Sequence, residues 1–223
     1  MQSTDRHDPA VDDEAPRVTP TRAPRLKPGE RRIHILQTLA TMLEAPKNEK
    51  ITTAALAARL GVSEAALYRH FASKAQMFEG LIEFIEQSIF GLVNQIVAKE
   101  PNGILQARAI ALMLLNFSAK NPGMTRVLTG EALVGEHERL TERVNQMLER
   151  VETSVKQCLR LGVMDANSHV ESIAVPLQAG YDPVIRASLL LSYIIGRWHR
   201  YARSGFVREP HESADAQLRL ILQ

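Results

Sequence analysis

Residues 51–78 read ITTAALAARLGVSEAALYRHFASKAQMF. This run predicts two short helices, because Thr52 or Thr53 can cap the first and Ser63 can cap the second through a side-chain oxygen. Gly61 lies between them and can adopt the left-handed conformation that ends a helix. Two short helices joined by such a tight turn form a helix-turn-helix, a unit whose second helix can enter the major groove of DNA.

Helical periodicity extends on both sides of this run. Apolar residues recur on one face before Pro46 ends the first helix, and Ser73 with Gln76 forms a capping-box pattern at the start of a long one. The expected helices cover residues 30–43, 53–60, 64–71, 74–97, 104–120, 122–130, 136–161, 183–203 and 213–222. Residues 162–181 show no clear pattern and look like an insertion. Aromatic residues make up only 5% of the chain and no strand alternation is visible, so the prediction is an all-α fold.

The chain has 223 residues, of which 45% are hydrophobic, enough to bury a sizeable core in one large domain or two smaller ones. Its single cysteine, Cys158, cannot form a disulfide within the chain, which fits a reducing cytoplasm. The polar, proline-rich N-terminus does not resemble a signal peptide. The longest apolar runs, residues 109–115 and 188–195, are too short to span a membrane. We therefore expect a cytoplasmic protein with no membrane partner.

Residues 1–28 are expected to be disordered, since they carry five prolines and many charges but almost no large apolar side chains. Their charge is divided, because residues 1–16 are acidic and the basic segment begins after them. The basic residues are Arg17, Arg22, Arg25, Lys27, Arg31 and Arg32. A basic arm next to a helix-turn-helix can bind DNA phosphates, although a solvated linker would have the same composition.

The exposed face of the second short helix carries side chains suited to nucleic-acid contacts. Glu64 could accept a hydrogen bond from a cytosine amino group, and Arg69 could bind either guanine or phosphate. The hydroxyl groups of Tyr68 and of the two threonines before the first helix suit phosphate oxygens, as does the ammonium of Lys74. The predicted DNA-binding residues are Arg31, Thr52, Thr53, Ser63, Glu64, Ala65, Tyr68, Arg69, His70 and Lys74.

No other chemistry stands out in the sequence. The seven histidines have no paired spacing typical of metal ligands, so no metal site is expected. The chain has no glycine-rich phosphate loop, acid pair or nucleophile constellation. We therefore predict that the protein is not an enzyme and needs no cofactor.

The helix-turn-helix resembles that of the TetR family of bacterial regulators. The resemblance rests on the apolar helix of residues 33–43, on ITTAALAARLGVS, and on LYRHFASK at residues 67–74. It implies a three-helix DNA-binding domain at residues 29–75 and a helical dimerisation and partner-binding domain at residues 76–223, with His70 as an orienting residue of the motif. Members of the family bind palindromic double-stranded DNA as homodimers, because two recognition helices must match two half-sites.

A second resemblance extends past the helix-turn-helix. RRIHILQTLATMLE, VSEAALYRHFASKAQMFEGLIEFIEQSIF and NPGMTRVLTGEALVGEHERLTERVNQMLERVE are similar to the SlmA family of nucleoid occlusion factors, over about residues 31–155. The resemblance implies a nucleoid-associated dimer that, while on DNA, binds the tubulin-like division protein FtsZ and blocks assembly of its ring over the chromosome.

The same resemblance implies a partner surface between the fourth and fifth helices. Its residues would include Phe84, Met113, Asn116, Lys120 and Asn121. Lys120 would face an acidic FtsZ tail. The chain departs from the family pattern at Leu92 and Met113, in its N-terminal extension and at residues 162–181.

The dimer interface is expected on two later helices, residues 136–161 and 183–203, which could form a four-helix interface. Its predicted apolar side comprises Leu189, Leu190, Tyr193, Ile194 and Trp198. On this prediction, a charge placed at Ile194 yields monomers that bind DNA poorly.

A different function remains open at this point. The commonest TetR-family role is that of a repressor responding to a small ligand, which requires a pocket lined by apolar side chains and a few polar groups. The helices at residues 104–120 and 183–203 could line such a pocket. Their apolar faces would look the same if they simply formed the core.

Overall fold

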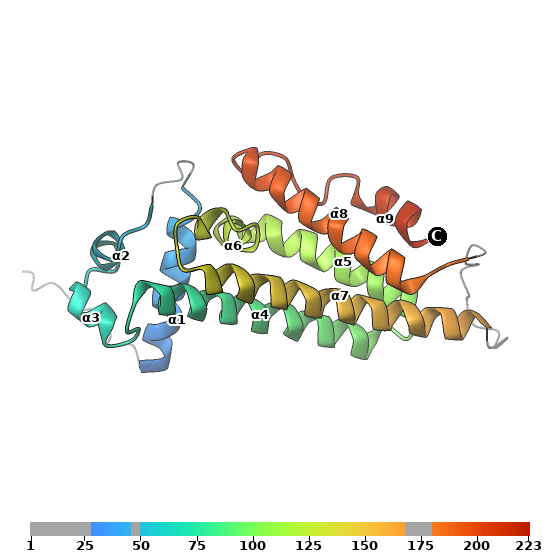
Figure 1. The fold of residues 1–223 in the computed structure, drawn as a ribbon, viewed down its shortest axis with the longest axis horizontal. Coiled ribbons are helices and arrows are strands. Elements are labelled where there is room, and N and C mark those ends of the chain that lie inside the picture. The colour runs from blue at the N-terminus through green and yellow to red at the C-terminus, as the bar shows by residue number, and fades with distance from the viewer. Residues whose placement is uncertain (1–27, 46–49, 168–179) are drawn as a thin grey trace, which may run out of the picture.

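The computed structural model of the chain describes residues 28–45, 50–167 and 180–223, and every regular element in these ranges is helical. The elements are α1 (Pro28–Met42), α2 (Thr53–Leu60), α3 (Glu64–Tyr68), α4 (Lys74–Lys99), α5 (Gly103–Lys120), α6 (Pro122–Leu128), the 3-10 helix η1 (Glu131–Leu133), α7 (Glu138–Asn167), α8 (Pro183–Arg203) and α9 (Ala214–Leu222). Figure 1 shows α1–α3 together at one end of the molecule, with the long helices α4, α5, α7 and α8 extending away from them. The predicted all-α fold is confirmed. The disorder expected for residues 1–28 concerns a segment that, apart from Pro28, lies outside the described residues.

Local signals in the sequence set the starts of α2, α3 and α4. The hydroxyl oxygens of Thr52, Ser63 and Ser73 each accept a hydrogen bond from a backbone amide in the first turn of the helix that follows. Gly61 ends α2 with φ 65° and ψ 33°, the left-handed conformation expected for it. The spacing of α2 and α3 around this turn confirms the helix-turn-helix.

The second helix of the motif is shorter than predicted. α3 ends at Tyr68 rather than near residue 71. The reason is a tighter turn, in which the His70 amide donates to the Leu67 carbonyl at 2.9 Å. This turn directs Phe71 into the core, where it is only 1% exposed. Burial of the Phe71 ring therefore determines where α3 ends.

The predicted end of α7 is also wrong, since the helix continues past residue 161 to Asn167. Gly162 lies inside α7, at the point where α5 crosses this helix. A Cβ at Gly162 would lie 2.7 Å from Ile104 Cγ1, and a Cβ at Gly103 would lie 2.1 Å from the Cys158 carbonyl oxygen. The two glycines therefore allow the backbones of α5 and α7 to touch. The rest of the expected insertion, residues 168–179, falls outside the described residues.

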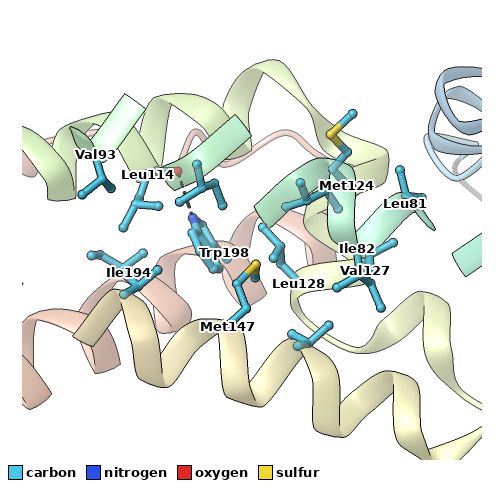
Figure 2. Packing of buried hydrophobic residues seen from close by; sticks show 14 of the residues in the cluster. Leu81, Ile82, Val93, Leu114, Met124, Val127, Leu128, Met147, Ile194 and Trp198 are labelled. Carbon is cyan, nitrogen blue, oxygen red and sulfur yellow. Dashed lines mark hydrogen bonds between the residues drawn. The ribbon is translucent and has the colours of Figure 1, made fainter. Parts of the chain in front are cut away.

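The core of the body lies between α5, α7 and α8. Trp198 of α8 is fully buried, and its Nε1 donates to the Leu114 carbonyl of α5 at 3.3 Å. Figure 2 shows Met147 of α7 and Leu128 of α6 beside the indole ring. One face of α8 is thus buried inside the protomer, so only its other faces are available to a second copy.

α4 runs from the helix-turn-helix into the body and, by length and composition alone, is apolar enough to cross a membrane. Eight of its residues, from Met77 to Val93, are instead buried in the protein. Glu86 on another side of the helix pairs with Arg143 of α7 at 3.1 Å and also with Arg150. α4 therefore packs on the body along one face and connects the two ends of the molecule.

Candidate DNA-binding, partner-binding and dimerisation surfaces

The helix-turn-helix presents one continuous exposed face. Leu56 and Ala57 of α2 and Leu67 of α3 are at most 3% exposed and belong to one core cluster, so one side of α3 is buried. The other side carries half of the side chains predicted to contact DNA. Those exposed there are Ser63, Glu64, Ala65, Tyr68 and Arg69. An exposed helix of this kind fits the major groove of B-DNA.

A short hydrogen bond joins the starts of α2 and α3. The Thr53 hydroxyl donates to Glu64 Oε2 at 2.6 Å, which holds the carboxylate at the N-terminal turn of α3. The second carboxylate oxygen can still accept from a base amino group. Thr52 caps α2 through its oxygen, which accepts the Ala55 amide at 3.1 Å and leaves the hydroxyl hydrogen able to donate to a phosphate. The two threonines therefore have different roles, which the sequence did not distinguish.

Lys74 is directed toward the body rather than toward the DNA-facing surface, which differs from the expectation. Its Nζ lies 2.5 Å from Glu136 Oε1, in the loop before α7, and 5.6 Å from the centre of the Phe78 ring. The Lys74 and Glu136 side chains are 24% and 12% exposed. The ammonium therefore joins the start of α4 to the body. Its partner is 62 residues away along the chain, so no local pattern could have revealed the pair.

Arg32 has a role that the sequence pattern does not reveal. Its Nη1 donates to the His70 carbonyl at 2.9 Å, and its guanidinium lies 4.1 Å from the centre of the Phe71 ring. These contacts fasten the first turn of α1 to the end of α3. Arg31 and His70, both predicted DNA contacts, are half-buried.

The predicted partner-binding residues lie on α4, on α5 and just before α6. Met113, Asn116 and Lys120 are three and four residues apart and share the accessible face of α5. Phe84 of α4 is half-buried against the core. Asn121 is also half-buried, and its Nδ2 donates to a carbonyl in the last turn of α5 at 2.7 Å. Asn116 and Lys120 are thus exposed, and the other three side chains are half-buried.

One edge of α4 borders this surface. Helical spacing places Phe84 and Leu92 on the same edge, while Glu79 and Glu86 lie on another edge and pair with arginines of α7. α4 also packs against α5, so the edge with Phe84 faces the α5 side. Leu92 is 37% exposed there. The surface between α4 and α5 therefore has an accessible apolar rim.

The structure overturns three of the five predicted dimer-interface residues. Leu190, Ile194 and Trp198 are 0% exposed within a single protomer, because this face of α8 packs on α5 and α7. Side chains with no accessible surface cannot contact a second copy. A charge at Ile194 would therefore disrupt the core rather than separate two folded protomers. Of the other two residues, Leu189 is exposed and Tyr193 is half-buried.

The accessible apolar surface of α8 lies on its opposite face. Ile185 and Leu189 are 65% and 47% exposed, and Ser192 and Gly196 continue the same stripe. Leu220 of α9, 72% exposed, lies with Ser192 and Gly196 around a shallow hollow between the two helices. α7 was expected to contribute to the interface, but its apolar stripe is buried in the protomer core. The exposed apolar surface next to α8 is instead supplied by Leu220 of α9.

Two tyrosines fasten α8 to its neighbours. The Tyr193 hydroxyl donates to Gln217 Oε1 of α9 at 2.7 Å, and the Tyr201 hydroxyl donates to the Ala119 carbonyl of α5 at 3.1 Å. Burial is the main cause that raises the pKa of both hydroxyls above the usual tyrosine range. Both groups therefore remain protonated and act as donors at neutral pH.

Metal and thiol chemistry find no support in the described ranges. No group of three or more His, Cys, Asp or Glu side chains there could hold a metal ion. Cys158 is buried, and desolvation raises the pKa of its thiol, which disfavours the reactive thiolate.

Two family models match the chain. The model for bacterial regulatory proteins of the tetR family matches residues 49–81, which contain the helix-turn-helix and the start of α4. A SlmA-like model, described as a tetracyclin repressor-like C-terminal domain, matches residues 102–223. The second match alone covers more than half of the chain and reaches its last helix.

Solved structures share this fold at low sequence identity. The regulator FadR from Bacillus subtilis, in complex with stearoyl-CoA, has a TM-score of 0.67 and 11% identity, over 86% of this chain and 97% of its own. AibR in complex with isovaleryl coenzyme A and operator DNA has a TM-score of 0.65 and 16% identity, over 86% and 97%. At this identity the likeness establishes the TetR-type fold alone.

Relatives with much higher sequence identity than these structures share one name. The nucleoid occlusion factor SlmA of Idiomarina loihiensis is 47% identical, over 86% of this chain and 94% of its own length. The SlmA proteins of Alteromonas mediterranea and Shewanella sediminis are 45% and 46% identical over 87% and 86% of this chain, and 95% and 93% of their own. None of these names denotes an enzyme, which agrees with the expectation from the sequence. The chain therefore belongs to the SlmA family of nucleoid occlusion factors, a branch of the TetR-type regulators.

Proposed function

We propose that this protein, as a homodimer on palindromic chromosomal sites, binds FtsZ and prevents assembly of the FtsZ ring over the nucleoid. The proposal rests above all on the 47% identity to a nucleoid occlusion factor, which covers the body as well as the helix-turn-helix. A helix-turn-helix alone would suit any TetR-type regulator. The protein would accordingly act in the cytoplasm, on the nucleoid.

DNA binding would use the exposed face of α3. The first turn, with Ser63, Glu64 and Ala65, would approach base edges in the major groove. The hydroxyls of Thr52 and Tyr68 would donate to phosphate oxygens on either side and fix the register of the helix. In this arrangement a few side chains recognise the DNA sequence. Most of the affinity comes from the contacts that the two protomers make with the DNA backbone.

Two copies would pair through the exposed faces of α8 and α9. Ile185 and Leu189 form the apolar stripe available on α8, and Leu220 adds to it from α9. A two-fold axis through such a face brings identical surfaces together, as in most homodimers. It would also place two α3 helices for two half-sites of a palindrome.

FtsZ would bind the surface between α4 and α5. Lys120 is exposed and carries the positive charge that would attract an acidic FtsZ tail. Phe84 and Leu92 offer apolar area along the adjoining edge of α4. The contact would then combine apolar burial along α4 with the charge of Lys120.

The two binding events would be linked. If the DNA-bound dimer has the higher affinity for FtsZ, then FtsZ must strengthen DNA binding by the same factor, because linkage is reciprocal in free energy. The inhibitor would therefore act only where its sites lie. Equal DNA affinity with and without saturating FtsZ would contradict this mechanism.

The deciding experiment is sedimentation of FtsZ polymer formed with GTP, in the presence of the purified protein. We expect polymer to be lost when a duplex carrying the selected palindrome is added, and to be retained with a scrambled duplex. Lys120→Glu should restore polymer while leaving DNA affinity unchanged, because charge reversal repels the acidic tail. Lys99→Glu, an equivalent charge reversal at the far end of α4, serves as the control and should behave like the wild type.

Two results would separate this proposal from its alternative. Full FtsZ polymer in every sample, together with tight palindrome binding, would favour a ligand-responsive repressor. Loss of polymer without any DNA would contradict the linked mechanism but retain the FtsZ contact.

A second prediction concerns the phosphate contacts. Arg69 is exposed at the end of α3, whereas Lys74 is paired with Glu136, so Arg69→Gln should weaken DNA binding far more than Lys74→Gln. If Arg69 binds phosphate, its loss from both protomers should reduce the slope of log affinity against log salt by about 1.8, since each contact adds about 0.9. The measurement is fluorescence anisotropy across a salt series. An unchanged slope with reduced discrimination between sites would instead assign Arg69 to a base.

A further inference from the structure

α6 lies directly against α1 of the DNA-binding end. A Cβ added to Gly123 would lie 1.9 Å from the Ala40 carbonyl oxygen, so the backbones of the two helices are in contact. The residues from Gly123 to Leu128 in α6 are all buried. Such a contact transmits displacement, since closely packed backbones cannot slide past each other without a cost.

Arg126 of α6 reaches across this contact to the end of α1. It is 5% exposed, and its Nη1 donates to the Leu43 carbonyl at 2.9 Å and to the Ala45 carbonyl at 2.5 Å. Leu43 and Ala45 follow Met42, the last residue of α1, so both acceptors belong to the turn that ends this helix. A buried guanidinium is therefore well suited to hold them.

The same guanidinium also contacts the segment that follows α8. It lies 4.8 Å from the centre of the Phe206 ring, and its Nε lies 3.8 Å from Glu131 Oε2. Phe206 in turn packs edge-on against Tyr201 of α8, with ring centres 5.1 Å apart. One side chain thus joins α1, η1 and the end of the helix that carries the proposed dimer interface.

The other end of this arrangement is the proposed partner surface. The Thr125 hydroxyl lies 3.0 Å from the carbonyl oxygens of Ser118 and Asn121, which fastens α6 to the last turn of α5. Asn121 and Lys120 at this turn belong to the surface proposed for FtsZ. A shift of the α5 end on binding would therefore move α6, and with it the contact to α1.

We propose that Arg126 is the positioning residue that locks α1 to α6 and so couples the partner surface to the DNA-binding helices. This inference rests on the proposed function and names the contact through which its linkage acts. A buried cation left without its carbonyl partners is costly, so α1 and α6 stay joined and move as one unit when the end of α5 shifts. The DNA-binding ends of a dimer are then presented at a fixed spacing.

The test compares DNA affinity with and without saturating GDP-bound FtsZ, measured by anisotropy on the selected palindrome. In the wild type we expect FtsZ to tighten DNA binding at least about fivefold, the lower end of typical coupling. Arg126→Gln should reduce this factor to about one while leaving FtsZ affinity without DNA unchanged, since the partner surface itself is intact. Arg126→Lys keeps the charge and should recover part of the factor.

Two further variants guard against a purely structural effect. Phe206→Leu removes the ring beside the guanidinium at a half-exposed position and should reduce the coupling factor without unfolding the protein. Arg139→Gln breaks an accessible pair with Glu79 and should leave the factor unchanged. Circular dichroism checks that every variant is folded.

A readout independent of FtsZ separates the two proposals. Spin labels at Arg59→Cys in a Cys158→Ala background report the distance between the two α2 helices of a dimer. We expect one narrow distribution in the wild type and a broad one for Arg126→Gln. A narrow distance distribution for Arg126→Gln would overturn the proposed role of Arg126, whatever the effect of FtsZ on DNA affinity. A second outcome would be a broad distance distribution for Arg126→Gln together with no effect of FtsZ on DNA binding by the wild type. This outcome would retain the role of Arg126 in joining α1 to α6 and overturn the linkage proposal instead.

Discussion

Leu189→Asp should convert the protein into a folded monomer. Leu189 is 47% exposed on the outer face of α8, next to Ile185, so a carboxylate there leaves the protomer core untouched. In the proposed dimer it would bury a charge against its own copy, which strongly disfavours association. A monomer loses the benefit of two linked half-site contacts, so affinity for the palindrome should fall by about 10²–10⁴-fold.

Sedimentation velocity and anisotropy measure these two effects on the same sample. Met164→Asp is a matched control, because Met164 is an apolar residue on α7 that is 69% exposed, more than Leu189, and lies outside the proposed interface. That variant should stay dimeric and bind DNA normally. A Leu189→Asp protein that remains a DNA-competent dimer would place the interface elsewhere.

Trp198→Ala should instead destabilise the protomer itself. Trp198 lies on the opposite face of α8, is 0% exposed, and donates to the Leu114 carbonyl. Truncating a buried tryptophan costs about 3–5 kcal/mol, because it removes apolar contacts and leaves a cavity. For a chain of this size each kcal/mol lowers Tm by about 2–4 °C, so Tm should fall by roughly 6–20 °C.

Thermal unfolding at one fixed protein concentration is the suitable measurement, since dimerisation also contributes to apparent stability. Trp198→Phe should have a smaller effect, because the ring keeps most of the packing and the Leu114 carbonyl keeps its helical partner. An unchanged Tm for Trp198→Ala would contradict the packing shown in Figure 2. Leu189→Asp and Trp198→Ala thus test two faces of one helix, and only the second should unfold the chain.

The sequence predicted the helix-turn-helix almost residue by residue. The starts of α2, α3 and α4 follow from Thr52, Ser63 and Ser73, whose side chains bond to the next turn of their own helix. Gly61 likewise sets the turn through its own backbone freedom. These are interactions between near neighbours in the chain, and local sequence contains everything that determines them.

Contacts between distant residues could not be predicted in this way. Lys74 meets Glu136, and Arg126 meets the end of α1, more than 60 and 80 residues away along the chain. A lysine at a helix start has the same local pattern whether its charge faces DNA or another helix. Only the packing of α6 and α7 against α1 and α4 decides between the two.

An all-helical protein with a helix-turn-helix follows from the caps, turns and helical periodicity of the sequence, because these arise between near neighbours in the chain. The resemblance to nucleoid occlusion factors rests instead on the longer matching runs over about residues 31–155. Which face of α8 is core and which is surface depends on tertiary packing. Leu189 and Leu190 are adjacent and equally apolar, yet one is 47% exposed and the other 0%. Both faces of α8 are apolar enough to be buried, and α5 and α7 can cover only one of them.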